Sequence, residues 1–524
     1  MPAAQITTAP FTSILFPEGA PDESADDDAL HDLALDQVFA RLGPAAPRAS
    51  EAYRVPLRSV AAVEYRQDVF RLLEQDGPRA LVTAFLRDVE RCDALEAAAA
   101  RASYPYEAAL HRLAAVARYV EAVTGLGAGL DEVHDIRARS RGWDGLARHV
   151  AALRASAAFG RLRDHAARLA AQVAALRYNA LVRGGRVTVA ATDDEPDLTA
   201  QVLSTFARFR QGDAEDYRTD YRPATLDHVQ AQMLGLAAEV HPDVFADLTD
   251  FAAHSEGYRD GVLIRFGEEV RFYLAYLGFL APLRGAGLRV CYPRVSADRK
   301  ELAVTDGWDL SLAARLVDAG RPVVRNDLRL AGPERILVIS GPNQGGKTTT
   351  ARLFGQLHHL AAIGCPVPAR DARVFLCDRV LTVFEREERL DSLEGRLGAE
   401  VQRLRQVFDT ATGRSVIVVN EAFASTALQD ARILTRDVLE RISTLDALAA
   451  CVTFIDELSR LNDRTVSMVS LVDPDDPAVR TFRVERRPAD GRAHARALAA
   501  RHGLTAEQIA DLLPGIPRHG RQDA

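Results

Sequence analysis

The stretch that decides the fold is RILVISGPNQGGKTTTARLFGQLHHLAAI, residues 335–363. It begins with an apolar run at 335–340, which is typical of a buried strand, and it ends with the apolar spacing of a helix. Between them, GPNQGGKT at 341–348 fits the pattern GxxxxGK[ST]. A strand, a glycine-rich loop and a helix in this order predict a phosphate-binding loop (P-loop). The alternative is a chance glycine turn before a helix.

The residue types in the loop suit phosphate binding. Glycines let backbone N–H groups turn toward phosphate oxygens, and the following helix adds the partial positive charge of its N-terminus. Lys347 is predicted to reach the β- and γ-phosphates, and Thr348 to offer its hydroxyl to Mg²⁺. The predicted nucleotide-binding residues are Gly341, Pro342, Asn343, Gln344, Gly345, Gly346, Lys347, Thr348 and Thr349.

Lysine is rare in this chain. Of 65 basic side chains only Lys300 and Lys347 are lysine, so arginine is used almost everywhere that a cation is needed. A lysine kept in the loop is expected to serve where a planar guanidinium cannot replace a compact ammonium. No role is predicted for Lys300.

A second buried strand, SVIVVN at 415–420, is followed by Glu421. Glu421 is the predicted catalytic residue, as general base or water-orienting group, and a surface carboxylate at a strand end is the alternative. Asn420 stands where nucleotide hydrolases usually carry an aspartate. Its amide can contact the metal through a bound water but brings no negative charge, which predicts weaker Mg²⁺ binding and slow turnover.

The predicted fold class is multidomain, α + α/β. Residues 1–53, rich in Pro, Ala and Asp, are expected to form a loosely attached N-terminal extension with one short helix at 32–42. Residues 54–290 have long helical patterns and predict a helical core or lever domain, with a small insert near 183–222 that starts with a hairpin. One of these patterns, 145–178, predicts a single helix of over thirty residues.

Residues 291–524 alternate short apolar runs with helical patterns, which predicts a parallel sheet covered on both faces. The expected strands are 335–340, 374–378, 415–420, 450–455, 465–472 and 481–486.

Composition excludes several classes of protein. At 48% hydrophobic and 26% charged residues with a net charge of −8, the chain is neither disordered, fibrous nor polybasic. Its five scattered cysteines form no CxxC pair. The adjacent His358 and His359 point in different directions on a helix, so packing or a surface position is favoured over a metal site. No secretory leader or membrane-spanning run is apparent, so a cytoplasmic location is expected.

Taken together, these segments resemble the ATPase domain of the MutS family, a branch of the ABC ATPases. The P-loop and AAIGCPVPA at 361–369 resemble the family's P-loop helix and its continuation. NEAFASTALQDA at 420–431 aligns with the family's DEIGRGTSTYDG, and VTFIDEL at 452–458 with its ATHYHEL strand. SLEGRLGAE at 392–400 lies where the family carries its signature segment, and its first Ser and last Glu match. The resemblance is strong over about 320–515.

The resemblance implies an ABC-type ATPase domain that binds ATP and Mg²⁺, and a homodimer in which Ser392 of one subunit faces Lys347 and Thr348 of the other. It also implies an ATP-dependent switch that binds DNA by shape or branching and is related to DNA mismatch repair. Two alternatives stay open: a nucleotide-gated protein–protein module without a DNA ligand, and an ATP-binding protein that does not hydrolyse.

The sequence departs from the family's pattern in three places. Asn420 replaces an aspartate, and Phe454 replaces a histidine that senses the γ-phosphate. The mismatch-reading domain is not apparent, and FPE at 16–18 is interpreted as a chance match to that domain's Phe-x-Glu wedge.

Overall fold

The computed structural model describes most of the chain and divides it into two compact units. One unit comprises Met1–Phe11 and Gln75–Gly267, and the other comprises Thr12–Glu74 and Glu268–Ala524. The domain boundaries 1–53, 54–290 and 291–524 stay a prediction. The described residues are 11–19, 25–43, 47–132, 140–184, 186–192, 205, 226–385, 396–424, 426–476 and 479–489.

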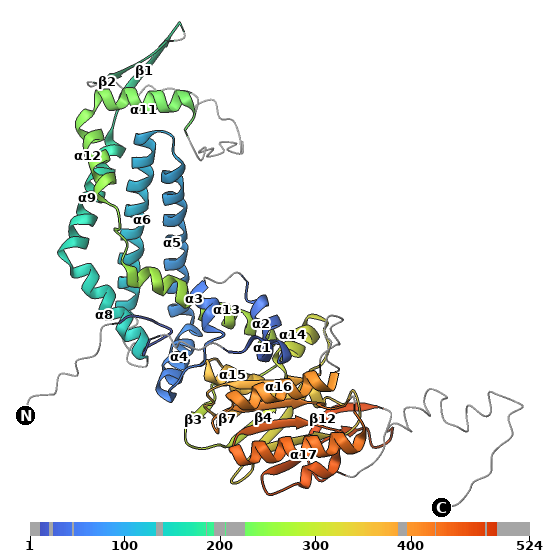
Figure 1. The fold of residues 1–524 in the computed structure, drawn as a ribbon. Helices are drawn as coiled ribbons and strands as arrows, with labels where there is room; N and C mark the ends of the chain where they lie inside the picture. Colours follow the sequence, from blue (N-terminus) through green and yellow to red (C-terminus); the bar gives the residue numbers. More distant parts are fainter. Residues whose placement is uncertain are drawn as a thin grey trace, which may run out of the picture. The chain divides into compact units, whose positions relative to one another are not determined.

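The first unit is a set of long helices with a β-hairpin beside α11 (Figure 1). The long helix α6 is the central element, because α5, α8, α9 and α12 all pack against it. The hairpin pairs β1 with β2 in antiparallel register, as expected from its alternating sequence. The elements are α5 (Asp76–Arg101), α6 (Pro105–Glu132), α8 (Arg141–Ala155), α9 (Ala157–Ala175), β1 (Tyr178–Arg183), β2 (Arg186–Ala191), α11 (His228–Val240) and α12 (Pro242–His254).

The single helix predicted over 145–178 is wrong, because the chain turns at Ser156. This residue has extended backbone angles (φ −68°, ψ 141°) between α8 and α9. Its hydroxyl accepts a hydrogen bond from the Phe159 backbone N–H at 3.2 Å and so caps the second helix. The apolar spacing continues through the break, whereas the signal for the break is one serine that prefers a cap to a helix interior.

Among the described helices, α6 is the one that is long and apolar enough to cross a membrane. Of its apolar window 56% is buried against neighbouring parts of the chain. The core helix of a water-soluble bundle has the same length and composition, so the helix is weak evidence for a membrane span.

The second unit contains two sheets and the helices around them. Its helices are α1 (Asp27–Asp32), α2 (Leu35–Arg41), α3 (Pro47–Ala52), α4 (Val60–Leu73), α13 (Gly261–Gly285, which begins in the first unit), α14 (Leu310–Asp318), α15 (Lys347–Ala362), α16 (Arg396–Thr410), α17 (Leu428–Leu445) and the 3₁₀ helix η1 (Asp456–Arg460).

The larger sheet has the order β12-β11-β6-β10-β9-β8, parallel except for the edge strand β12. Every residue of β6, β8, β9 and β10 is buried, and for β6, β9 and β10 this agrees with the unbroken apolar runs expected in a sheet covered on both faces. The strands are β6 (Ile336–Ser340), β8 (Val380–Phe384), β9 (Val416–Asn420), β10 (Leu448–Val452), β11 (Thr465–Val472) and β12 (Arg480–Arg486).

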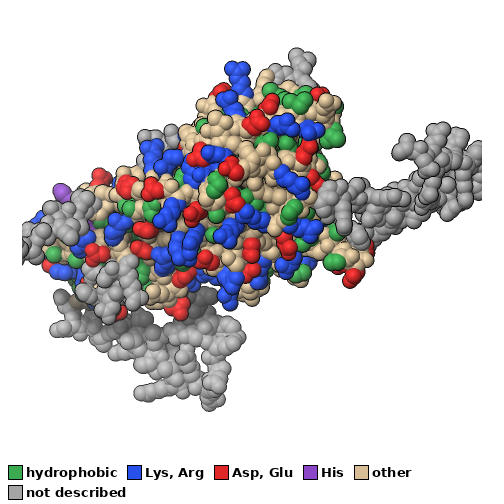
Figure 2. All heavy atoms as spheres, turned by 90° about the horizontal axis from the view of Figure 1, so that it is seen from below, with side chains coloured by type: hydrophobic (Ala, Val, Ile, Leu, Met, Phe, Trp, Pro, Cys, Tyr) green, Lys and Arg blue, Asp and Glu red, His purple; other side chains and the backbone are tan. Residues whose placement is uncertain are grey.

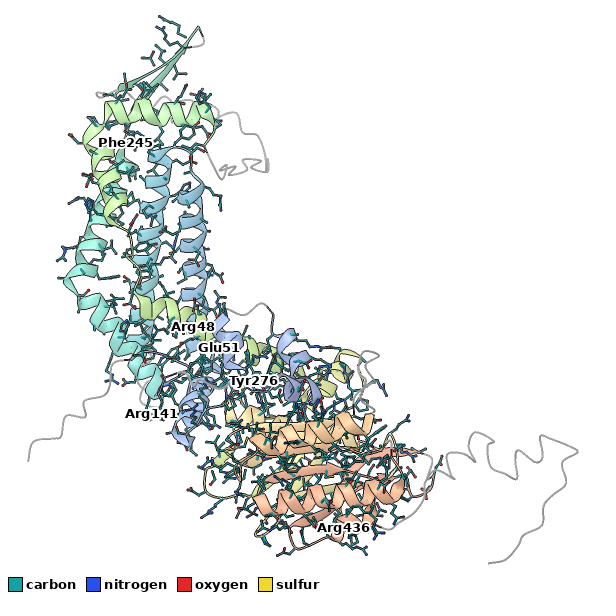
Figure 3. All side chains as sticks on the ribbon, viewed as in Figure 1. Arg48, Glu51, Arg141, Phe245, Tyr276 and Arg436 are labelled. Atoms are coloured by element: carbon teal, nitrogen blue, oxygen red, sulfur yellow. The ribbon has the colours of Figure 1, made fainter. Side chains whose placement is uncertain are left out.

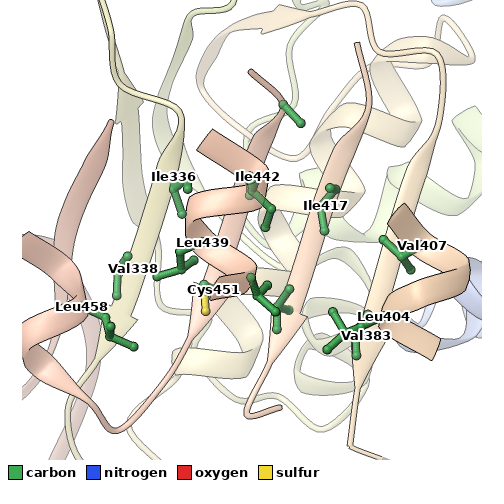
Figure 4. Packing of buried hydrophobic residues seen from close by; sticks show 14 of the residues in the cluster. Ile336, Val338, Val383, Leu404, Val407, Ile417, Leu439, Ile442, Cys451 and Leu458 are labelled. Atoms are coloured by element: carbon green, nitrogen blue, oxygen red, sulfur yellow. The ribbon is translucent and has the colours of Figure 1, made fainter. Parts of the chain in front are cut away.

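The core on one side of this sheet is closed by α16 and α17 (Figure 4). Ile336, Ile417 and Cys451 from the strands meet Leu404 of α16 and Leu439 of α17, and all are buried. The helix α15 contacts the strands β6 to β10 and is buried along almost its whole length.

Two parts of this architecture were not predicted. The strand β8 was missed because its run VLTVF stands next to a charged stretch. The smaller sheet, with the order β3-β7-β4-β5, was not predicted as a second sheet: its strands are short, and the expected strand 374–378 overlaps β7 of this sheet only at residues 374–375. Its strands are β3 (Arg294–Ser296), β4 (Leu302–Gly307), β5 (Asn326–Leu330) and β7 (Asp371–Phe375).

The loosely attached N-terminal extension is also a wrong prediction for its described part. Buried side chains bind the backbone of residues 13–15. The Glu269 carboxylate accepts hydrogen bonds from the Ser13 hydroxyl at 2.8 Å and the Ile14 N–H at 2.9 Å. The buried Arg66 guanidinium donates to the carbonyls of Leu15 at 2.8 Å and Ile363 at 2.9 Å. The segment that begins at Thr12 is therefore held within the second unit.

Two residues of the FPE segment have contacts within the second unit, and its interpretation as a chance match stays a prediction. Phe16 is buried beneath the Arg66 guanidinium, 4.7 Å from the ring centroid, and Glu18 accepts from the Ser59 hydroxyl. An aromatic cluster continues from there through Tyr53 and Phe272 to Tyr276. Tyr276 is labelled in Figure 3. These residues lie too deep to insert into a ligand.

Lys300 acquires a role in the structure. Its ammonium donates to both the backbone carbonyl and the carboxylate of Asp446, each at 2.7 Å. Asp446 ends α17 in a left-handed conformation (φ 61°), and its carboxylate also accepts from Arg335 and Arg464. Partial desolvation raises the pKa of the Asp446 carboxyl, but the hydrogen bonds from these cations outweigh it and lower that pKa to about 2.

We expect Asp446→Asn to destabilise the protein near neutral pH. Asparagine accepts the left-handed backbone, so the change removes the charge with little strain. The folded pKa lies below the unfolded value of about 3.9, so the stabilisation by the carboxylate is present above that pH and is lost as the pH falls toward 2. Urea unfolding of both proteins from pH 7 to pH 2.5 should show a difference that shrinks below about pH 4. A difference independent of pH would contradict this explanation.

Candidate functional site

The loop between β6 and α15 depends on glycine at close contacts with β11. Gly341 has φ 117°, and a Cβ on it would lie 2.9 Å from the Ser470 carbonyl oxygen. At Gly345 a Cβ would lie 2.1 Å from the Ser470 hydroxyl, which donates to the Gly345 carbonyl at 2.6 Å. Gly346, at φ 94°, is the N-cap of α15. Gln344 also takes a left-handed conformation, at φ 59°. These constraints fix the loop in a tight curve over the start of the helix.

Lys347 is the first residue of α15, and its ammonium lies within this curve. It donates to the Gly341 carbonyl at 3.0 Å, the Pro342 carbonyl at 3.2 Å and the Asn343 side-chain oxygen at 3.2 Å. The side chain is 4% exposed. Burial lowers the pKa of the Lys347 ammonium although the nearby Glu421 acts in the opposite direction, and Arg480 lowers it further.

Glu421 and Phe454 approach the same ammonium from neighbouring strands. The Glu421 carboxylate lies 3.6 Å from Lys347 Nζ, and the Phe454 ring centroid lies 4.5 Å from it. The ring is 48% exposed and faces the cation in the geometry of a cation–π contact. The structure therefore brings three sequence-predicted positions together around one buried charge.

Three more predicted site residues adjoin these in sequence: Asn420 precedes Glu421, and Thr348 and Thr349 follow Lys347. Asn420 is the last residue of β9 and is 8% exposed, and its amide oxygen has no hydrogen-bond partner among the described residues. Thr348 and Thr349 are half-buried in the first turn of α15. Ser392, the predicted signature residue, lies outside the described residues.

The turn after β9 has an unusual backbone. Glu421 and Phe423 both have positive φ, 54° and 65°. The Glu421 N–H donates to the Val452 carbonyl at 3.0 Å, and the Phe423 N–H donates to the Glu400 carboxylate at 2.9 Å. Non-glycine residues in this region cost conformational energy and persist where surrounding contacts hold them.

Sequence reasoning missed three residues that shape this site. Glu400 holds the turn, although the sequence showed it only as a match at the end of SLEGRLGAE. Ser470 closes the loop from β11. Arg480, on β12, donates to the Asn343 carbonyl at 3.1 Å and adds a second cation beside Lys347. Their spacing from the loop in sequence, over 50 residues in each case, gave no signal.

The two adjacent histidines pack in the interior, as predicted. The Nδ1–H of His358 donates to the Phe354 carbonyl at 2.7 Å, and the Nε2–H of His359 donates to the Tyr53 carbonyl at 2.8 Å. Burial lowers the pKa of each imidazole to about 4, so both are neutral near pH 7. The five cysteines are free thiols. Among the described residues no group of three or more His, Cys, Asp or Glu side chains could hold a metal ion.

Comparison with known proteins places the site in a family domain. Residues 337–483 match the model for MutS domain V. The chain is 31% identical over 183 residues to the "DNA mismatch repair protein MutS" of Chlorobaculum parvum, which is 35% of this chain and 21% of that protein. It is 31% identical over 233 residues to the "DNA mismatch repair protein MutS 1" of Halobacterium salinarum, which is 42% of this chain and 26% of that protein.

These matches span only about a fifth to a quarter of the relatives' own length. The family-model match at 337–483 covers β6 from its second residue, the glycine loop, α15, β9 and the turn after it, which are the elements that surround Lys347. This chain is therefore MutS-like, with the likeness to MutS domain V over residues 337–483.

Proposed function

We propose that this chain is an ATP-dependent switch that binds ATP with Mg²⁺ at residues 341–349, hydrolyses it slowly and acts on DNA in a process related to mismatch repair. The observation that carries the proposal is the environment of Lys347. Its ammonium is buried among neutral oxygens of the loop, with one carboxylate, Glu421, 3.6 Å away and a second cation, Arg480, beside the loop.

Burying a cation is costly unless negative charge compensates it. Beside the buried Lys347 ammonium lies the Glu421 carboxylate, at the long distance of 3.6 Å. A polyphosphate would bring further negative charge to the ammonium, and the N-terminus of α15 would add favourable backbone dipoles. The ligand that the loop favours is therefore a nucleoside triphosphate.

Mg²⁺ would be held by Thr348 directly and by Asn420 through a water molecule. The unpartnered, buried amide oxygen of Asn420 fits this role, because Mg²⁺ prefers oxygen ligands and keeps several waters. The ion would neutralise charge between phosphate oxygens. Neither protein ligand carries a negative charge, which supports weak metal binding and slow turnover.

Glu421 is the proposed water-orienting base. Glu421 follows the carboxyl end of β9 and lies 3.6 Å from the Lys347 ammonium. The neighbouring strand, β10, is followed by Phe454. Because Glu421 has a positive φ, its side chain leaves the end of β9 in a direction that extended backbone would not give. Phe454 cannot hydrogen-bond to phosphate and shields the Lys347 ammonium instead.

The rest of the proposal extends the resemblance. A cytoplasmic homodimer would place Ser392 of one subunit across from Lys347 of the other, and DNA would be recognised by its shape. The relatives named above are called mismatch repair proteins, and this supports DNA as the ligand. On the face drawn in Figure 2, basic and acidic side chains of the described residues are interspersed. Because basic side chains are not gathered by themselves on that face, a nucleotide-gated protein–protein module without a DNA ligand stays the second candidate.

Lys347→Ala should weaken ATP binding by about ten- to a hundredfold, because it removes a charge-assisted contact to phosphate. Lys347→Arg should also weaken it, since the side chain is buried and three acceptors lie within 3.2 Å of its nitrogen. Fluorescent ATP titration measures both, with Arg405→Ala, an exposed cation on α16, as control. Equal affinity in wild type and Lys347→Ala would rule out the nucleotide site.

Glu421→Gln should retain ATP binding and lower phosphate release by about a hundredfold or more, because the amide cannot accept a proton from water. The matched control is Glu440→Gln, which changes an exposed carboxylate on α17. Turnover unchanged in Glu421→Gln would place the base elsewhere. Wild type that binds ATP without releasing phosphate would select the non-hydrolysing alternative.

The DNA ligand can be tested with duplex, single-stranded and branched DNA, with and without ATP, at several salt concentrations. We expect binding that weakens with salt and changes with ATP, because contacts to phosphates release counterions. No salt-dependent binding to any of the three would favour the protein–protein module.

A further inference from the structure

The helix α16 makes a buried contact with the turn that carries Glu421. From its second turn, Glu400 accepts the Phe423 backbone N–H at 2.9 Å. Phe423 is itself buried in the core and has a positive φ of 65°. Since this amide belongs to the turn that starts at Glu421, the position of Glu400 sets where the turn lies.

One helical turn further along, α16 is tied to the N-terminal segment. The guanidinium of Arg403 donates to the Asp32 carboxylate at 2.8 Å and, through Nε, to the Thr382 carbonyl at 3.1 Å. The Thr382 hydroxyl donates to the same oxygen of Asp32 at 2.6 Å. Asp32 is 7% exposed, and Arg403 has a second, longer ion pair with Asp28. The Asp32 carboxylate thus joins α1, β8 and α16.

Residues 32–33 of the N-terminal segment also contact α15, the helix that begins with Lys347. The Asp32 carbonyl accepts from Arg352 at 3.2 Å, and the Leu33 carbonyl accepts from the buried Gln356 amide at 2.9 Å. The Leu33 side chain fills the space beside Gly355, where a Cβ would lie 2.4 Å from it. One short segment, 32–33, therefore contacts both α15, which begins with Lys347, and α16, which holds the turn that starts at Glu421.

We propose that Asp32 and Glu400 are positioning residues for Glu421, acting through α16. Asp32 fixes the helix through Arg403, and Glu400 transmits that position to the Phe423 amide and the turn 421–423. The inference rests on the proposed function, because it concerns the residue proposed to orient water. It adds that a segment some 390 residues away in sequence controls the geometry of that residue.

The first test measures the link without nucleotide. Hydrogen exchange of the peptide covering 420–424 should be roughly fivefold faster or more in Glu400→Ala, because the Phe423 N–H loses its acceptor. Glu400→Gln keeps a side-chain oxygen and should restore slow exchange. Asp32→Asn should also speed exchange in this peptide, whereas Asp409→Ala, on the exposed face of α16, should not. Unchanged exchange in both Glu400→Ala and Asp32→Asn would overturn the proposal.

The second test measures turnover at saturating ATP. Glu400→Ala and Asp32→Asn should each lower the rate of phosphate release by about tenfold or more while the ATP dissociation constant stays within about twofold, because a small displacement of a catalytic group lowers its efficiency. The double variant should lose less than the product of the two effects, since both act through one helix. Wild-type turnover in both variants would overturn the proposal.

The failure of the proposed function gives a different pattern. Wild type that does not bind ATP would remove the nucleotide site, and the exchange measurement would still decide whether Asp32 and Glu400 hold the turn. A purely structural role would instead lower the unfolding temperature and weaken ATP binding together, with no rescue by Glu400→Gln. Thermal unfolding of every variant separates these cases.

Discussion

The candidate site depends on the parallel pairing of three buried strands. In β10, Val452 lies between Ile339 of β6 and Asn420 of β9, so β6 and β9 end within one residue of the same level. Parallel strands place their carboxyl ends on one edge of a sheet, and the segments that leave these ends meet there. The glycine loop follows β6, Glu421 follows β9 and Phe454 follows β10. A shift of one residue in this register would separate Glu421 from Lys347.

The second constraint is the burial of positive charge. Both lysines of the chain donate to backbone carbonyl oxygens: Lys347 to Gly341 and Pro342, and Lys300 to Asp446. A compact ammonium can place its three hydrogens on several closely spaced acceptors, whereas a guanidinium is planar and larger. The low number of lysines in an arginine-rich chain agrees with this geometry. The two positions differ in their carboxylates: Asp446 hydrogen-bonds to Lys300 at 2.7 Å and is shared with Arg335 and Arg464, whereas Glu421 lies 3.6 Å from Lys347.

Much of the second unit could be predicted because its signals are local. The strands around the loop are unbroken apolar runs, and the glycines precede a helical pattern. In the first unit, the hairpin at 178–191 could be predicted from its alternation. The features that could not be predicted are set by single residues or by distant partners. Ser156 divides one apolar pattern into two helices. The N-terminal segment looked loosely attached because nothing in residues 13–15 themselves names Glu269 or Arg66 as partners.

The division of the chain has a consequence for synthesis. The second unit is assembled from two separate pieces, Thr12–Glu74 and Glu268–Ala524, whereas Gln75–Gly267 is continuous. Gln75–Gly267 leaves the ribosome before Glu268–Ala524, so its helices can pack while the later strands do not yet exist. The segment around Leu33 leaves earlier still, and its partner α15 follows more than 300 residues later. Slow translation would lengthen the time for which the apolar side chains of this segment lack that partner.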